Sequence, residues 1–269
     1  MQNNVADQLK ILVCYHKSYT MPQNDNNIFL PIHCGKALTD LDLHIQPDNS
    51  LNGQLCDNIS EKNPYYSELT AIYWAWKNIK KLYPDIKYVG LFHYRRFFAF
   101  NERKFFTEEI NKSEREILNY KIDPQRIINI LESGEIILTH KHNFPFSVAE
   151  QYNQCHFSED LRVLDNIIKS QFSEYYTAFV KIMNGNKLFA RNMFIMKYED
   201  FCDYCEWLFA VLSEVDKQIN YKTYYSPYQI RVPAFMSERL FNVYMLNHGK
   251  KAKFLNIYFF EGGGAASET

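Results

Sequence analysis

Short apolar runs that end in polar residues recur along the chain and predict the strands of a sheet. A continuous apolar run, rich in β-branched and aromatic residues and bounded by turn residues, is typical of a strand that is buried on both faces. Several runs are followed directly by histidine, lysine or arginine, so the pattern places polar side chains at strand ends. The runs cover residues 9–15, 29–33, 88–92, 135–139 and 193–196.

Apolar residues at three- and four-residue spacing predict helices between and after these strands. Asn63 with Pro64, or Ser67, is expected to cap the first helix, and Asp123 with Pro124 begins the second. Strands and helices alternate in the first half and helices dominate the second, which indicates an α/β fold with helical elaboration in the C-terminal half. The predicted helices cover residues 66–82, 123–131, 147–155, 158–172, 174–183, 200–215 and 236–245.

The chain shows no internal repeat and no long linker, so we expect one domain over residues 1–260. The charged stretch 101–121 is expected to form an exposed helical insertion or lid near the site. The last residues, 261–269, are rich in glycine and other small residues and are expected to be a disordered tail.

Composition and charge limit the kinds of ligand and the location that we expect for the protein. The formal net charge of the 269 residues is −1, so no global field attracts nucleic acid and any phosphate site must be local. No window approaches the roughly 20 apolar residues of a membrane-spanning helix, and the amino terminus lacks a signal pattern. We therefore expect a cytoplasmic protein.

The most informative polar cluster follows the run 88–92. His93, Tyr94, Arg95 and Arg96 stand at its carboxyl end, where ligands bind in open α/β sheets. Two guanidinium groups and an imidazole suit an anion such as a phosphate or diphosphate, because arginine presents a planar fork of donors to oxygen atoms. The alternative is a structural ion-pair cluster, since such networks resemble binding sites.

A second polar cluster precedes the first predicted helix. Asp57, Asn58, Ser60 and Asn63 lie in a loop that is dense in turn-forming residues. Such a loop at a helix amino terminus suits the hydroxyls or phosphates of a ligand. The alternative is that one or two of these residues only cap the helix.

Histidine supplies a weaker, different hypothesis. His140 and His142 follow the run 135–139 and are two residues apart, a spacing that places both on one face of a strand. Together with His93 and His156 they would define a metal-dependent hydrolase.

Five ordered motifs resemble one bacterial family, the domain of unknown function numbered 4422, which is found in capsular polysaccharide and lipopolysaccharide biosynthesis. The likeness runs from about residue 10 to residue 260. The motifs are Asp57-Asn-Ile-Ser60, Asn63-Pro-x-Tyr-x-Glu-Leu-Thr-Ala-x-Tyr-Trp-Ala-Trp-Lys-Asn78, Gly90-Leu-x-His-Tyr-Arg-Arg-Phe97, Asn192-Met-Phe-Ile-Met196 and Ser237-Glu-Arg-Leu-Phe-Asn242.

The resemblance implies a glycosyltransferase of the GT-A type, with a Rossmann-like mixed sheet flanked by helices. It further implies a nucleotide-sugar donor, most often a uridine diphosphate (UDP) sugar, and a growing or lipid-linked glycan as acceptor, with transfer by inversion. The alternative is a non-catalytic accessory protein that binds nucleotide sugars or glycans during polysaccharide assembly. Any contact with the inner face of the cytoplasmic membrane would be peripheral, through the acceptor lipid or an aromatic surface such as residues 221–228.

The resemblance also assigns roles at the strand end. Many GT-A enzymes carry an Asp-x-Asp metal motif there, where this chain has Arg95 and Arg96, so we expect the cationic side chains to replace the metal. No metal cofactor is therefore predicted, and Mn²⁺ or Mg²⁺ is the alternative. The literal Asp40-Leu-Asp42 precedes the polar loop rather than ending the central strand.

Three residues are predicted to be catalytic: Glu238 as the base that deprotonates the acceptor, with Arg95 and His93. The alternative for Glu238 is a residue at a helix start that pairs with Arg239 or Arg231. The predicted donor-binding residues are His16, Lys17, Gly35, Lys36, Asp57, Asn58, Ser60, Asn63, Glu68, Tyr94, Arg96, Arg191 and Asn192.

Overall fold

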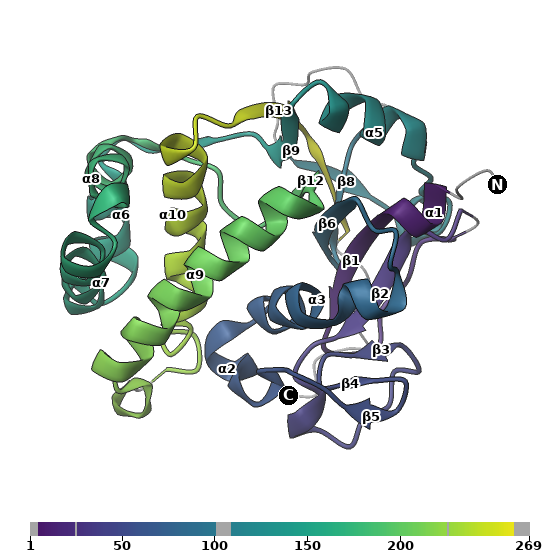
Figure 1. Cartoon of the computed structure of the whole chain (residues 1–269), viewed down its shortest axis with the longest axis horizontal. Coiled ribbons are helices and arrows are strands. Elements are labelled where there is room, and N and C mark those ends of the chain that lie inside the picture. Colours follow the sequence, from purple (N-terminus) through teal and green to yellow (C-terminus); the bar gives the residue numbers. More distant parts are fainter. Residues whose placement is uncertain (1–4, 25, 101–108, 225, 261–269) are drawn as a thin grey trace.

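A mixed β-sheet with helices on both faces forms the centre of the protein (Figure 1). The computed structural model describes residues 5–24, 26–100, 109–224 and 226–260. Within these ranges the sheet has ten strands: β1 (Leu9–Tyr15), β2 (Phe29–His33), β3 (Gln46–Pro47), β6 (Tyr88–His93), β7 (Arg96–Phe98), β8 (Glu109–Lys112), β9 (Glu135–Thr139), β12 (Phe194–Lys197), β13 (Lys251–Leu255) and β14 (Ile257–Phe260).

The strand order brings three strand ends to one edge of the sheet. β1 lies between β2 and β6 and runs parallel to both, whereas β12 is antiparallel to β6 and β9. Cys14 of β1 pairs with His93 of β6, and Tyr15 of β1 pairs with His33 of β2. The polar residues that follow these strands therefore start from the same edge, as the sequence predicted.

Alternation along β1 separates two cores. Leu12 and Cys14 face a cluster that includes the fully buried Trp74, while Ile11 and Val13 face a second cluster on the other side of the sheet. Burial on both faces explains why these strands are continuously apolar. The expected mixed α/β fold is therefore confirmed.

Helices cover both faces of the sheet and form most of the C-terminal half. In Figure 1, α6, α7 and α8 lie together beyond α10, on the side away from the sheet. The helices are α1 (Val5–Gln8), α2 (Asn63–Tyr66), α3 (Leu69–Leu82), α4 (Glu114–Leu118), α5 (Pro124–Glu132), α6 (Val148–Cys155), α7 (Ser158–Gln171), α8 (Tyr176–Asn184), α9 (Tyr198–Gln218) and α10 (Val232–Asn247). No helix within the described ranges is long and apolar enough to cross a bilayer.

Short elements complete the chain. Two small antiparallel pairs join β4 (Ser50–Leu51) with β5 (Gln54–Leu55), and β10 (His142–Asn143) with β11 (Lys187–Leu188). Single turns of 3₁₀-helix are η1 (Lys36–Leu38), η2 (Ser60–Lys62), η3 (Ser173–Tyr175) and η4 (Tyr221–Thr223).

Two predicted helix starts differ from the structure. The helix expected from residue 66 begins at Leu69, because Ser67 has φ +50° and ψ −126° and interrupts the helical path between α2 and α3. That conformation costs an L residue on the order of 1–3 kcal/mol. The helix expected from residue 236 begins at Val232 with Pro233 in its first turn, so Glu238 lies inside α10 rather than at its start.

The C-terminal strands were not predicted from the sequence. β14 pairs with β7 and β8, and β13 pairs with β9, so the last part of the chain extends a sheet begun by the first. Part of the expected helical insertion forms β8 and α4. Residues 101–108 and the predicted tail 261–269 lie outside the described residues, and the single domain over 1–260 stays a prediction.

Asp48 ties the loop after β2 to the segment before α2. Its side chain is buried and accepts hydrogen bonds from the Gly35 amide (2.7 Å), the Lys36 amide (3.1 Å) and the Ser60 hydroxyl. A buried carboxylate stabilises the fold when its hydrogen bonds are all made, and the loss of one donor leaves the buried charge incompletely bonded. Asp48 thus places η1 beside η2.

We predict that Asp48→Asn destabilises the protein by about 2 kcal/mol, because the amide would turn N–H groups toward donors that need an acceptor. The matched control is Asp42→Asn, because Asp42 is 64% exposed and accepts from the His44 amide. The free energy of unfolding in urea measures both variants. Equal stability of the two would contradict the role assigned to Asp48.

Candidate active site

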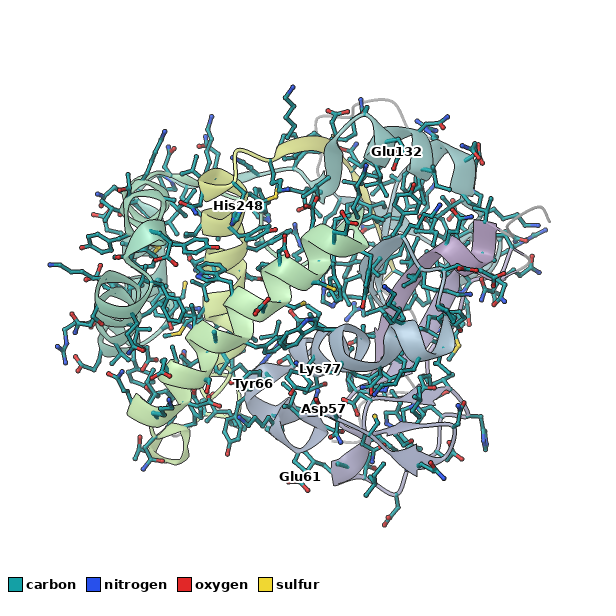
Figure 2. The ribbon with its side chains drawn as sticks, viewed as in Figure 1. Asp57, Glu61, Tyr66, Lys77, Glu132 and His248 are labelled. Atoms are coloured by element: carbon teal, nitrogen blue, oxygen red, sulfur yellow. The ribbon has the colours of Figure 1, made fainter. Side chains whose placement is uncertain are left out.

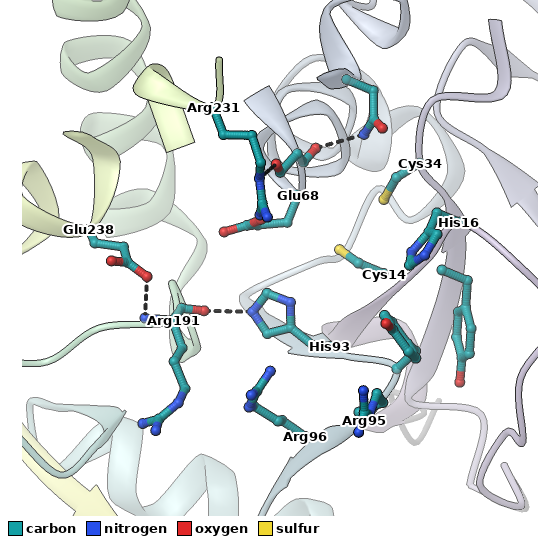
Figure 3. A pocket seen from close by; sticks show the side chains of 14 residues that line it. Cys14, His16, Cys34, Glu68, His93, Arg95, Arg96, Arg191, Arg231 and Glu238 are labelled. Carbon is teal, nitrogen blue, oxygen red and sulfur yellow. Dashed lines mark hydrogen bonds between the residues drawn. The ribbon is translucent and has the colours of Figure 1, made fainter. Parts of the chain in front are cut away.

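A cavity of about 430 Å³ opens at the carboxyl ends of β1, β2 and β6. Its walls come from these strand ends, from α2 and the start of α3, from the segment before β12, and from α10 (Figure 3). Arginine dominates the charge. The lining residues are Cys14, Tyr15, His16, Cys34, Asn63, Ser67, Glu68, His93, Tyr94, Arg95, Arg96, Arg191, Arg231 and Glu238.

Within the described residues, three of the four arginines donate hydrogen bonds through Nε alone, and two of them, Arg95 and Arg96, also stack on the Phe259 ring. Arg95 Nε donates to the Phe260 carbonyl (2.9 Å) and Arg96 Nε to Glu109 Oε1 (3.4 Å), while Arg231 Nε donates to the Ser67 hydroxyl (2.8 Å). Their terminal Nη groups donate no hydrogen bond within the described ranges. Each guanidinium is therefore held in place and keeps its outer edge for a ligand.

The backbone N–H and carbonyl of Arg191 bond to two of the predicted catalytic side chains. Its N–H donates to Glu238 Oε1 (2.8 Å), and its carbonyl lies 2.6 Å from His93 Nε2 (Figure 3). Because a carbonyl can only accept, Nε2 of His93 carries the proton of that bond. Arg191 Nη2 also pairs with Glu109 Oε1 at 3.0 Å. Backbone groups thus orient both His93 and Glu238.

Two carboxylates line the cavity. Glu238 is fixed by the Arg191 amide and by Arg239 Nη1 at 3.1 Å. Glu68 Oε1 accepts from Asn192 Nδ2 at 2.7 Å. Because four arginines outnumber two glutamates, the lining carries net positive charge, which favours an anionic ligand.

Comparison with known proteins identifies the family and the fold. The family described as domain of unknown function (DUF4422) matches residues 10–250. The chain belongs to this family. No curated protein sequence matches the chain.

A solved structure, that of the WbbM bifunctional glycosyltransferase in its apo form, is similar in fold, with a TM-score of 0.82 and 28% sequence identity. The match covers 97% of this chain and 48% of that protein, so the chain spans about half of its length. The expected family and the glycosyltransferase-type fold are therefore confirmed.

The structure brings nine of the predicted site residues into the cavity wall. They come from five separate segments of the chain, which only the fold unites. They are His16, Asn63, Glu68, His93, Tyr94, Arg95, Arg96, Arg191 and Glu238. Burial lowers the pKa of His16, and the charges of Lys17 and Arg231 lower it further, so its imidazole stays neutral at pH 7.

Seven predicted site residues lie outside this wall, most of them engaged in local structure. Asp57 accepts from the Tyr73 hydroxyl, and Asn58 donates to the Cys56 carbonyl. Asn192 is buried behind the wall, where it donates to Glu68 and Ser237. The remaining four are Lys17, Gly35, Lys36 and Ser60.

The sequence analysis missed five residues of the wall. Cys14, Tyr15 and Cys34 lie at the ends of β1 and β2, and their position at strand ends was a usable signal. Ser67 was considered only as a helix cap, and Arg231 only as a partner of Glu238. Nothing in their spacing indicated that α2 and α10 would meet.

The metal-dependent hydrolase is not supported. Within the residues that the structure places, no group of three or more His, Cys, Asp or Glu side chains is arranged to hold a metal ion. His140 stacks on Phe254, and His156 stacks on Phe235 with ring centroids 3.9 Å apart. These histidines belong to separate aromatic contacts.

We predict that His156 makes stability fall in mild acid. Burial lowers the pKa of His156 to about 4 from its ordinary 6.5. Between pH 6.5 and 4 the unfolded chain therefore binds a proton that the folded chain refuses, so the free energy of unfolding decreases as the pH falls. Tm measured from pH 7 to pH 4 should show this slope.

The His156→Gln variant removes the titrating group and should show a shallower slope over the same pH range. His44→Gln is the matched control, because the His44 side chain is 87% exposed. A slope for His156→Gln as steep as that of the wild type would refute the assignment.

Proposed function

We propose that the protein is a glycosyltransferase that transfers a sugar from a nucleotide-sugar donor, a UDP-sugar, to a hydroxyl of a growing capsular or lipopolysaccharide glycan. The observation that carries the proposal is the set of guanidinium groups that line one cavity and, within the described residues, donate hydrogen bonds through Nε alone. A diphosphate offers the oxygens that such edges bind. The family and the similarity to WbbM support the same reaction class.

The proposed reaction proceeds with inversion. An acceptor hydroxyl oxygen attacks the anomeric carbon of the donor sugar, and the bond from that carbon to the diphosphate oxygen breaks. The electron pair leaves with the nucleoside diphosphate, whose developing charge Arg95 and Arg96 stabilise. The hydroxyl proton passes to the carboxylate of Glu238.

The geometry supports Glu238 as the base. Its Oε1 is fixed by a backbone amide and its Oε2 by Arg239, so the carboxylate has one orientation before substrate binds. His93 donates Nε2–H to the Arg191 carbonyl and keeps its Nδ1 for the cavity. Glu68 is the second carboxylate of the wall and the natural comparison for Glu238.

The strand end does not fit a divalent metal. Mn²⁺ and Mg²⁺ need carboxylate or other oxygen ligands, whereas Arg95 and Arg96 offer only donors. Asp42 of the Asp40-Leu-Asp42 match is exposed and accepts from the His44 amide. We therefore propose that the protein cations do the electrostatic work, with Mn²⁺ or Mg²⁺ as the alternative.

We expect the wild type to release free nucleoside diphosphate when it is incubated with a panel of nucleotide sugars, even by slow hydrolysis without an acceptor. The rate should be unchanged by EDTA, because guanidinium groups replace the metal. Product release measured by chromatography tests both points.

Loss of activity in EDTA and its recovery with Mn²⁺ would support the metal-dependent alternative. Binding of donor without turnover, across donors and acceptors, would support the accessory protein instead.

We predict that Glu238→Gln lowers kcat by about 10²–10⁴-fold while donor binding is retained, because the amide keeps the shape but cannot accept the proton. Glu68→Gln is the matched variant. Transfer kinetics and donor affinity are measured for both. Transfer by Glu238→Gln at the wild-type rate would remove Glu238 as the base, and a selective loss in Glu68→Gln would give Glu68 that role.

A further inference from the structure

Two side chains on the far wall of the cavity have no part in the reaction described above. Ser67 separates α2 from α3, and Arg231 directly precedes α10. Both line the cavity. Figure 3 shows Arg231 on the side away from Arg95 and Arg96.

Ser67 adopts a backbone conformation that suits glycine better than serine. Its φ of +50° and ψ of −126° are the mirror image of the extended region. Hydrogen bonds hold it there: its N–H donates to the Asn63 carbonyl (2.8 Å), and its carbonyl accepts from Asn63 Nδ2 (2.9 Å) and the Thr70 amide (3.2 Å). The strained turn places the serine side chain in the cavity wall.

The pair formed by these residues offers a ligand mainly hydrogen-bond donors. Arg231 Nε donates to Ser67 Oγ at 2.8 Å, so the serine oxygen acts as acceptor and its own O–H is left to donate. The Nη groups of Arg231 make no hydrogen bond to the residues the structure describes. An oxyanion, which only accepts, matches this set.

Arg231 also lacks a carboxylate partner in the described parts of the chain. The neighbouring Glu68 is bonded through Oε1 to Asn192. The positive charge of Arg231 reaches His16 on the same cavity and helps to lower the pKa of that imidazole. An arginine at a cavity wall that forms no ion pair with the described residues attracts an anion.

We propose that Ser67 and Arg231 form a second oxyanion-binding element, the Ser67–Arg231 clamp, which holds a phosphate group of the nucleotide donor from the side opposite to Arg95 and Arg96. The clamp rests on the proposed function and adds to it. The donor diphosphate binds to two walls of the cavity, so its phosphates are fixed relative to both α3 and the strand end. A sugar hydroxyl, which both donates and accepts, fits this donor-rich pair less well than an oxyanion does.

The test compares Ser67→Gly, Ser67→Ala and Arg231→Gln with the wild type. UDP and uridine are the probes, titrated by calorimetry, and Tm is measured for each protein. Ser67→Gly relieves the backbone strain and removes the hydroxyl, whereas Ser67→Ala removes only the hydroxyl. Ser170→Ala and Arg162→Gln are matched controls on α7, where both side chains are exposed.

We expect both Ser67 variants to bind UDP about tenfold more weakly and Arg231→Gln to bind it about tenfold to a hundredfold more weakly, because each variant removes a donor to a charged acceptor, the phosphate. Uridine affinity should be unchanged. The Tm of Ser67→Gly should equal or exceed that of the wild type. A purely structural serine would instead leave UDP affinity intact in Ser67→Gly.

Wild-type UDP affinity in Ser67→Gly and Arg231→Gln would overturn the clamp, and a raised KM for acceptor in those variants would assign the pair to the acceptor. Absence of UDP binding by the wild type is a separate result. It would reject the UDP-sugar donor, and the clamp with it, before any variant is compared.

Discussion

The candidate site depends on the turn formed by Arg191 and Asn192, which ends one residue before β12. Both have positive φ, 77° and 49°, although neither is glycine. Hydrogen bonds on every side compensate for this conformation: the Arg191 peptide bonds to Glu238 and His93, and the Asn192 side chain bonds to Glu68 and Ser237. A strained turn of this kind persists only where contacts with the surrounding structure hold its backbone in place.

That turn explains why segments distant in sequence form one cavity. It holds the end of β6 on one side and α10 on the other, and it fixes the first turn of α3 through Glu68. A shift of the Arg191 backbone would therefore move His93 and Glu238 together. The two residues proposed for proton transfer and orientation are coupled through backbone rather than through each other.

The arginines show how one residue type serves structure and ligand together. The sequence left open whether they bind an anion or hold neighbouring carboxylates. Arg96 does hold Glu109, but through Nε, and Arg95 uses Nε for the Phe260 carbonyl. A planar guanidinium has donors on separate edges, so anchoring one edge leaves the other for a ligand. The two interpretations are therefore compatible.

The sequence alone determined the central strands, most helices, the family and nine residues of the cavity wall, because apolar runs and strand-end residues are local patterns. It did not determine the break at Ser67, the start of α10 at Val232, or the pairing of β14 with β7 and β8. Those depend on contacts between residues far apart in the chain. The strand end at His93-Tyr94-Arg95-Arg96 was visible as chemistry in the sequence, but only the tertiary structure placed Glu238, Glu68, Ser67 and Arg231 around it.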